Sequence, residues 1–163
     1  MPITYKPEIG SLSEVPNGSW QSTADQSATV AGNEYIVSFN STDFERGMRL
    51  ASGNRIYVDN SGLYNLQYAM QLYNSGGGGS TAHVHFWFKV NGTAVPETAS
   101  RQSCTSNNPY QAASRDYFLT LVAGDYVQIA YEVSDTSISL LHENASGVIP
   151  VLPSAVLTMT MVG

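Results

Sequence analysis

The 163 residues carry a formal net charge of −6, and only 12% of them are charged while 42% are hydrophobic. With 7 Lys and Arg residues the chain has no basic cluster for phosphate contacts, so we predict no nucleic-acid partner. No apolar run approaches the roughly 20 residues that cross a bilayer, and we expect no membrane insertion. The length suits a single domain with one core.

The N-terminal residues differ from the rest of the chain. Residues 1–18 include Pro2, Pro7 and Pro16 and show neither helical nor strand periodicity. We predict an extended arm over residues 1–18, followed by one β domain over residues 19–163. The start has neither a basic region nor an apolar run, so we expect synthesis in the cytoplasm without a secretion signal.

Strand-like segments follow one another along the β domain, and no amphipathic helix interrupts them. The polar stretch at 40–54, punctuated by Gly47 and Gly53, is predicted to be a loop. About eight to ten strands at regular spacing are typical of an antiparallel sandwich or jelly roll. In chain order, the predicted strands cover residues 20–24, 34–39, 55–59, 63–74, 82–90, 117–121, 126–133, 137–142 and 155–162, with a further exposed strand inside 97–110.

The segment at 63–74 shows the strongest alternation. Its apolar residues fall at every second position, which places them on one face of a strand and the intervening polar residues on the other. In the segment at 117–121, the same period places Phe118 opposite to its apolar neighbours. The inward set of the first segment is Tyr64, Leu66, Tyr68, Met70 and Leu72.

Glycines mark the predicted turns. Asn91-Gly92 is the dipeptide favoured in a type I′ hairpin turn, and the turn around Gly124 is predicted to join two strands as a hairpin. The glycine-rich run at 75–80 is interpreted as a native hairpin loop, with a fusion scar as the alternative. Asp125 is expected to accept backbone N–H bonds from its own turn.

Few residues suggest chemistry. His83 and His85 lie two apart on a strand, so they share a face and can bind a metal only with a third ligand, such as His142 or Glu143. The interpretation we favour is that both histidines pair with neighbouring hydroxyl groups. Cys104 lies in a polar segment with no base nearby and is predicted to be an incidental loop thiol.

No pattern of catalytic residues accompanies these side chains. The chain contains no nucleophile-elbow or phosphate-loop motif, and its acidic residues are scattered. We therefore predict a protein that is not an enzyme and that uses no cofactor and no metal.

Two groups of residues carry a resemblance to known proteins. The segment from Arg55 to Leu66 and the segment from Leu119 to Ile129 resemble the recurring marks of the jelly-roll head shared by complement globular heads and tumour necrosis factor. Over residues 20–162 the chain is also similar to small virion proteins of tailed phages of cyanobacteria and marine bacteria. The phrases concerned lie at 55–67, 89–96, 121–127 and 153–160. The chain departs from that pattern at Val122-Ala123 and in its long N-terminal arm.

This resemblance implies a threefold assembly with one sheet of each protomer around the axis. The outward residues of the segment at 63–74 then face either the axis or solvent, and the family analogy favours the axis. The large ring of Phe118 suggests an interface for the same reason. The predicted trimer-interface residues are Asn65, Gln67, Ala69, Gln71 and Phe118.

Two virion roles follow from the resemblance. The first is a capsid decoration or cement protein on the outer surface of the particle, made in the host cytoplasm and bound to the major capsid protein or another virion protein. The second is a trimeric receptor-binding head of a tail fibre or adhesin, on which aromatics such as Tyr73 or Tyr110 stack against host surface glycans. The proline-bearing arm is too short and too irregular for a trimeric stalk, which favours decoration, because an extended segment can become ordered on a preformed lattice. The predicted docking residues of the arm are Pro2, Tyr5, Pro7, Ile9 and Leu12.

Overall fold

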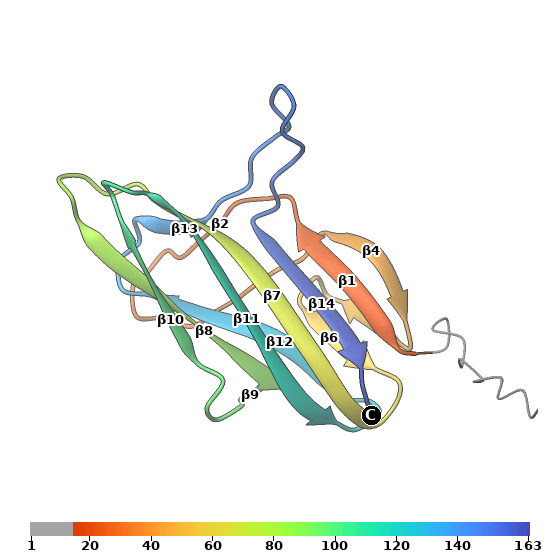
Figure 1. Ribbon diagram of the computed structural model, residues 1–163. Coiled ribbons are helices and arrows are strands. Elements are labelled where there is room, and N and C mark those ends of the chain that lie inside the picture. Colours follow the sequence, from red (N-terminus) through yellow and green to blue (C-terminus); the bar gives the residue numbers. More distant parts are fainter. Residues whose placement is uncertain (1–14) are drawn as a thin grey trace, which may run out of the picture.

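The computed structural model describes residues 15–163, which form fourteen β-strands and no helix. The strands make two antiparallel sheets that face each other as a sandwich (Figure 1). Within these residues there is accordingly no helix long and apolar enough to cross a membrane. The predicted all-β antiparallel jelly roll is confirmed, with more strands than expected because three of them are only two residues long.

The first sheet, sheet A, is built around the longest strand, β7. On one side of β7 lies β11, and on its other side β14 pairs with residues 64–70 and β13 with residues 72–74. Beyond β14 lie β1 and β4, and beyond β13 lies β2. Every pairing in the sheet is antiparallel. The strands of sheet A are β1 (Asn17–Ser22), β2 (Gln26–Ser27), β4 (Ser41–Arg46), β7 (Gly62–Asn74), β11 (Tyr110–Leu121), β13 (Ile138–Leu140) and β14 (Ala155–Met161).

The second sheet, sheet B, runs in the order β10-β8-β12-β6-β5, with β3 added to β12 and β9 added to β8. It is also antiparallel throughout. The strands of sheet B are β3 (Tyr35–Ile36), β5 (Met48–Ala51), β6 (Arg55–Val58), β8 (Thr81–Val90), β9 (Thr93–Ala94), β10 (Ser100–Thr105) and β12 (Tyr126–Val133).

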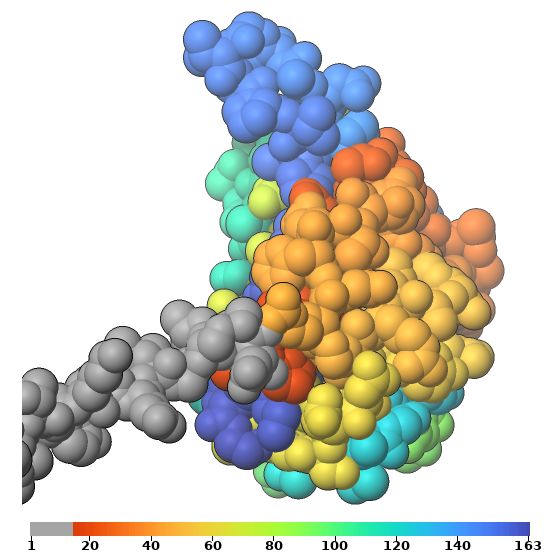
Figure 2. Space-filling view, turned by 90° about the vertical axis from the view of Figure 1, so that its right-hand side faces the viewer, coloured from red at the N-terminus to blue at the C-terminus, as the bar shows by residue number. Residues whose placement is uncertain are grey.

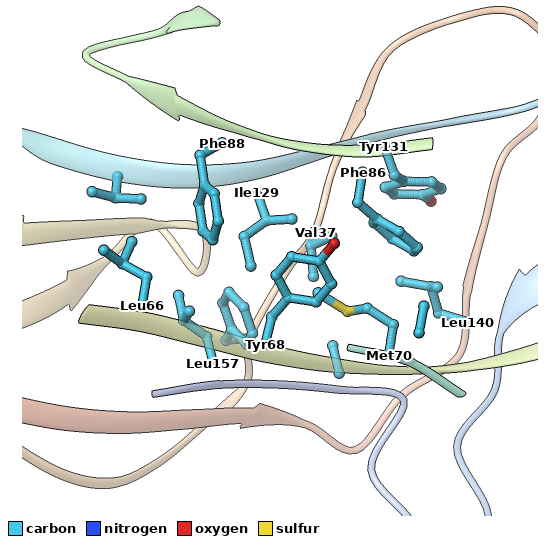
Figure 3. Close-up of a cluster of buried hydrophobic side chains, with 14 of the residues drawn as sticks. Val37, Leu66, Tyr68, Met70, Phe86, Phe88, Ile129, Tyr131, Leu140 and Leu157 are labelled. Carbon is cyan, nitrogen blue, oxygen red and sulfur yellow. The ribbon is translucent and has the colours of Figure 1, made fainter. Parts of the chain in front are cut away.

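The core lies between the two sheets and is formed by the inward residues of each strand. Figure 3 shows Tyr68 and Met70 of β7 facing Phe86 of β8 and Ile129 of β12. The ring of Tyr68 lies 5.7 Å from that of Phe86, centroid to centroid. The inward set predicted for β7, Tyr64, Leu66, Tyr68, Met70 and Leu72, is confirmed, since all five are buried. Alternation along β7 thus fixes which of its faces is covered.

Trp20 fills the core beneath β1 and β4. Its ring is fully buried, and its indole N–H donates to Glu45 Oε2 at 3.2 Å. The ring lies across Gly18, where a Cβ would come within 2.3 Å of it. Gly18, two residues before Trp20 on the same strand, therefore makes room for the largest side chain in this part of the core.

Two glycine turns that were predicted to close hairpins instead connect strands of different sheets. The turn around Gly124 links β11 of sheet A to β12 of sheet B, and the run at 75–80 links β7 of sheet A to β8 of sheet B. Both turns form, and Gly124 has a φ of 93°. Neither closes a hairpin, because its flanking strands pair elsewhere. By contrast, the Asn91-Gly92 turn closes the predicted hairpin between β8 and β9.

Further boundaries differ from the sequence prediction. The strand predicted at 117–121 begins at residue 110, as β11. The stretch at 40–54 contains β4 and β5, which lie at the edges of sheets A and B, instead of a continuous loop. Asn17 and Gly18 belong to β1, so the last residues assigned to the arm are part of sheet A. The arm residues Pro2, Tyr5, Pro7, Ile9 and Leu12 lie outside the described residues.

Three buried tyrosines make the fold sensitive to alkali. Burial raises the pKa of Tyr64, of Tyr68 and of Tyr131 above the ordinary value of 10.0. Below that pH both the folded and the unfolded chain hold these protons, and stability is at its full value. Above it the unfolded chain releases them first, so the free energy of unfolding falls as the pH rises towards the folded-state pKa values.

We therefore expect the thermal midpoint to fall between about pH 10 and about pH 11, and to fall less in Tyr68→Phe, which removes one of these protons. Thermal melts followed by circular dichroism at constant ionic strength measure both slopes. A wild-type midpoint that stays level over this range, or an unchanged slope in the variant, would contradict the assignment.

Candidate interaction face

The outward side chains of three neighbouring strands, β11, β7 and β14, form one continuous surface. Phe118 of β11 and Thr160 of β14 both lie opposite Asn65 of β7. Directly opposed residues of antiparallel strands point to the same side of the sheet, so these three form a row across it. We call this surface the outer face of sheet A, and its residues are Leu63, Asn65, Gln67, Ala69, Gln71, Tyr73, Tyr110, Ala112, Ser114, Asp116, Phe118, Thr120, Val156, Thr158 and Thr160.

Charge is almost absent from the outer face of sheet A. Asp116 is the one charged residue on it, whereas Phe118 and Tyr110 are 60% and 58% exposed. Depletion of charge and exposed aromatic rings are features of protein interfaces. The face therefore has the composition of a surface that is covered by another molecule.

The middle of this face is hollowed. Ala69 lies between Ser114 of β11 and Val156 of β14, and these small and medium side chains leave an open depression of about 410 Å³. Its rim includes Gln67 and Thr158, which supply amide and hydroxyl groups for hydrogen bonds. Arg115 and Asp116 also line the hollow and add one charge of each sign. A depression with an apolar floor and a mostly uncharged rim suits a packed protein contact.

The structure brings together all five residues predicted from the sequence for the trimer interface. Asn65, Gln67, Ala69 and Gln71 share one side of β7, and Phe118 lies beside Asn65. Sequence reasoning did not identify the outward residues of β14, which are Val156, Thr158 and Thr160. Alternation within β14 separates its two faces, but only the pairing with β7 shows which surface they join.

The outer face of sheet B has a different character. Lys89 of β8 forms an ion pair with Glu34, and Nδ1 of His85 lies 2.8 Å from Oε2 of Glu132. Ionisable side chains on this face thus find partners within the chain. The outer face of sheet A, with Asp116 alone, has the lower charge of the two.

His83 and His85 share a side of β8, as predicted, and their rings meet edge to face at 5.1 Å. His85 pairs with the carboxylate of Glu132, where a hydroxyl partner was expected. His142 is distant from these two histidines in the sequence, and its backbone N–H donates to Asp25. In residues 15–163 no three His, Cys, Asp or Glu side chains are grouped closely enough to hold a metal ion.

Two other predicted roles are resolved by hydrogen bonds. The carboxylate of Asp125 accepts the backbone N–H of Val122 at 2.8 Å, which confirms its role within the turn. Cys104 belongs to β10, is buried, and donates its thiol to the carbonyl of Pro109 at 3.0 Å. The prediction of a loop thiol is wrong, and burial raises the pKa of this thiol above its ordinary value of 9.0.

Comparison with known proteins identifies the fold. No protein-family model matches the chain, and no curated protein sequence matches it. Its fold is similar to that of murine APRIL, with a TM-score of 0.57 and 12% sequence identity to the crystal structure at pH 8.5. The structure at pH 5.0 gives a TM-score of 0.54 at 14% identity. Each match covers 91% of this chain and 99% of that chain. The chain therefore has a tumour necrosis factor-like jelly-roll fold.

Proposed function

We propose that the chain is a non-enzymatic structural protein of a tailed-phage virion, which assembles as a homotrimer and decorates the outer surface of the capsid. The observation that carries the proposal is the sparsely charged outer face of sheet A, with its exposed Phe118. Such a face is costly to leave in water and becomes useful when a second protomer covers it. A cyclic trimer covers it in every copy at once.

The phage assignment is supported by the sequence phrases that resemble small virion proteins. They cover all of β6 with the start of β7, the β8–β9 hairpin, the β11–β12 turn and most of β14. The acidic residue of the third phrase, Asp125, is engaged in its own turn, where it bonds Val122 and Asn91. These phrases therefore specify a folded head that acts through its surfaces.

The decoration role is tested by capsid binding. We expect the full chain to bind saturably to emptied capsids of the encoding phage, with the major capsid protein or a neighbouring virion protein as the partner. A variant in which the predicted docking residues are all serine should bind at least about tenfold more weakly. The residues changed are Pro2, Tyr5, Pro7, Ile9 and Leu12.

The matched control replaces five serines and threonines of the β domain's exposed loops with alanine and should bind as the wild type does. Co-sedimentation with capsids at a series of concentrations gives both affinities. Equal binding by the arm variant would contradict docking through the arm. Binding of the wild type to host cells, with none to capsids, would overturn decoration itself.

A receptor-binding head is the second candidate, and one contact favours it. The rings of Tyr73 and Tyr110 lie 5.2 Å apart at one end of the outer face, and Tyr110 is 58% exposed. Exposed aromatic rings are suited to stacking against sugars, with host surface glycans as the partner. Loss of host-cell adhesion in Tyr110→Ala, with capsid binding absent in the wild type, would support this role over decoration.

A further inference from the structure

A long hairpin between β13 and β14 extends away from the body of the molecule. Residues 141–154 leave the sheets at the end opposite to the C-terminus, as Figure 1 shows in blue at the top. Two pairs of reciprocal backbone hydrogen bonds close the hairpin, one between Glu143 and Leu152 and one between Ser146 and Ile149. The segment is thus an ordered arm with defined strand-like pairing.

The tip of the hairpin is a tight turn that presents apolar side chains. Gly147 has a φ of 59° at the first central position between Ser146 and Ile149, which is where a type II′ turn requires glycine. Val148 is fully exposed, and Ile149 is 63% exposed. A rigid turn that holds two branched apolar residues in water is expected to have a partner.

Low charge favours a second copy of this chain as the partner. Glu143 in the stem is the one acidic residue of the hairpin, and residues 144–154 have no charged side chain, although the chain as a whole carries a net charge of −6. Copies of this segment can therefore approach each other without the repulsion that acts between acidic surfaces. The absence of basic residues likewise gives the segment no electrostatic attraction to anionic lipid.

The hairpin lies next to the outer face of sheet A. Figure 2 shows the hairpin rising on the left, the side on which sheet A lies. Leu141 and Leu152 of its stem, together with Leu72 and Tyr110 of sheet A, line a hollow of about 290 Å³. The stem is therefore continuous with the end of the outer face of sheet A, and the tip projects beyond it.

We propose that this tip is a second self-association contact, in which Val148 and Ile149 of the three protomers meet at the symmetry axis. The proposal rests on the proposed trimer, in which the outer face of sheet A surrounds that axis. Points related by a cyclic axis lie at the same height along it, so a tip that projects beyond the rest of the head can meet the equivalent tips. The contact would close the trimer at the end remote from the C-terminus.

Disulfide trapping tests the proposal directly. In Val148→Cys, mild oxidation should link two protomers, because equivalent residues at a threefold contact come close enough for a disulfide. Cys104 is buried and does not compete. The matched control is Val30→Cys, which introduces an exposed thiol on the loop between β2 and β3. Non-reducing electrophoresis should show the dimer band for the first variant at least about tenfold above the second.

A second variant covers the case in which the thiols are misaligned. Val148→Asp with Ile149→Asp should raise the trimer dissociation constant at least about tenfold, since it gathers like charges at the axis. Both residues are exposed, so the protomer should keep its wild-type thermal midpoint. If the wild type is trimeric, but the cysteines link no better than at Val30 and the aspartates leave dissociation unchanged, the tip contact is wrong. If the wild type is monomeric, the trimer itself fails.

Discussion

Replacing Ala69 with Glu is expected to leave the protomer folded and to abolish the trimer at micromolar concentration. Ala69 lies at the floor of the hollow in the outer face of sheet A, between Ser114 and Val156. In the separate protomer a glutamate at this position points into solvent and costs little. In the trimer it is buried in a hollow whose lining then holds two carboxylates, its own and that of Asp116, against one cation, Arg115, so one negative charge is left unpaired.

The expected size of this effect follows from the cost of an unpaired buried charge. That cost is about 3–5 kcal/mol for each protomer, which corresponds to more than about a hundredfold in the dissociation constant. Sedimentation velocity gives the populations, and circular dichroism checks the fold. The matched control is Ala99→Glu, which adds the same charge at an exposed alanine before β10. A variant that sediments as the wild type does would show that this face is not the interface.

Replacing Trp20 with Ala is expected to cost about 3–5 kcal/mol of unfolding free energy, the range for removing a large buried aromatic residue. The change empties the space beneath β1 and β4 and leaves the carboxylate of Glu45 without its indole donor. Since domains of this size are stable by about 5–15 kcal/mol, the loss is a large share of the total.

Trp87 provides the control for this change. It lies on the outward side of β8, opposite Ala130 of β12, and is partly exposed. Trp87→Ala should therefore lose less than about half as much stability as Trp20→Ala. Urea unfolding followed by circular dichroism measures both losses of unfolding free energy, because this signal does not rely on the fluorescence of the tryptophan that each substitution removes. Equal losses in the two variants would contradict the assignment of Trp20 to the core.

The parts of the fold that alternation specifies could be predicted from the sequence. In the segment now seen as β7, every second residue is apolar, so both the strand and its buried face followed from a period of two. The outward position of Phe118 followed in the same way. A pattern of this kind depends only on the residues of the strand itself, so it does not depend on which strands pair with it.

The pairing of strands could not be predicted in the same way. The turn at Gly124 has the local chemistry of a hairpin, yet β11 finds its partner in β7 and β12 finds its partners in β8, β6 and β3. The residues of a turn determine how the chain bends, but they do not determine which sheet each flanking strand joins. The edge strand β4 was missed because its residues are mostly polar and exposed. The edge strand β5 was missed because it has only four residues and lies between Gly47 and Gly53.

The candidate face was predicted only as far as single strands allow. The outward residues of β7 were identified, but those of β14 became part of the same surface only through the pairing of Thr160 with Asn65. The hairpin at residues 141–154 had no signal of its own in the sequence, since its apolar residues look like a strand end. Its exposure is a property of the folded chain.

The mass of the wild-type protein in solution tests the central claim most directly. If the sparsely charged outer face of sheet A is a self-association surface, sedimentation equilibrium at micromolar concentration should give a particle of three times the chain mass of 17.6 kDa. A single species of 17.6 kDa over the same concentrations would contradict the account. In that case the outer face of sheet A would have to be covered by a different molecule.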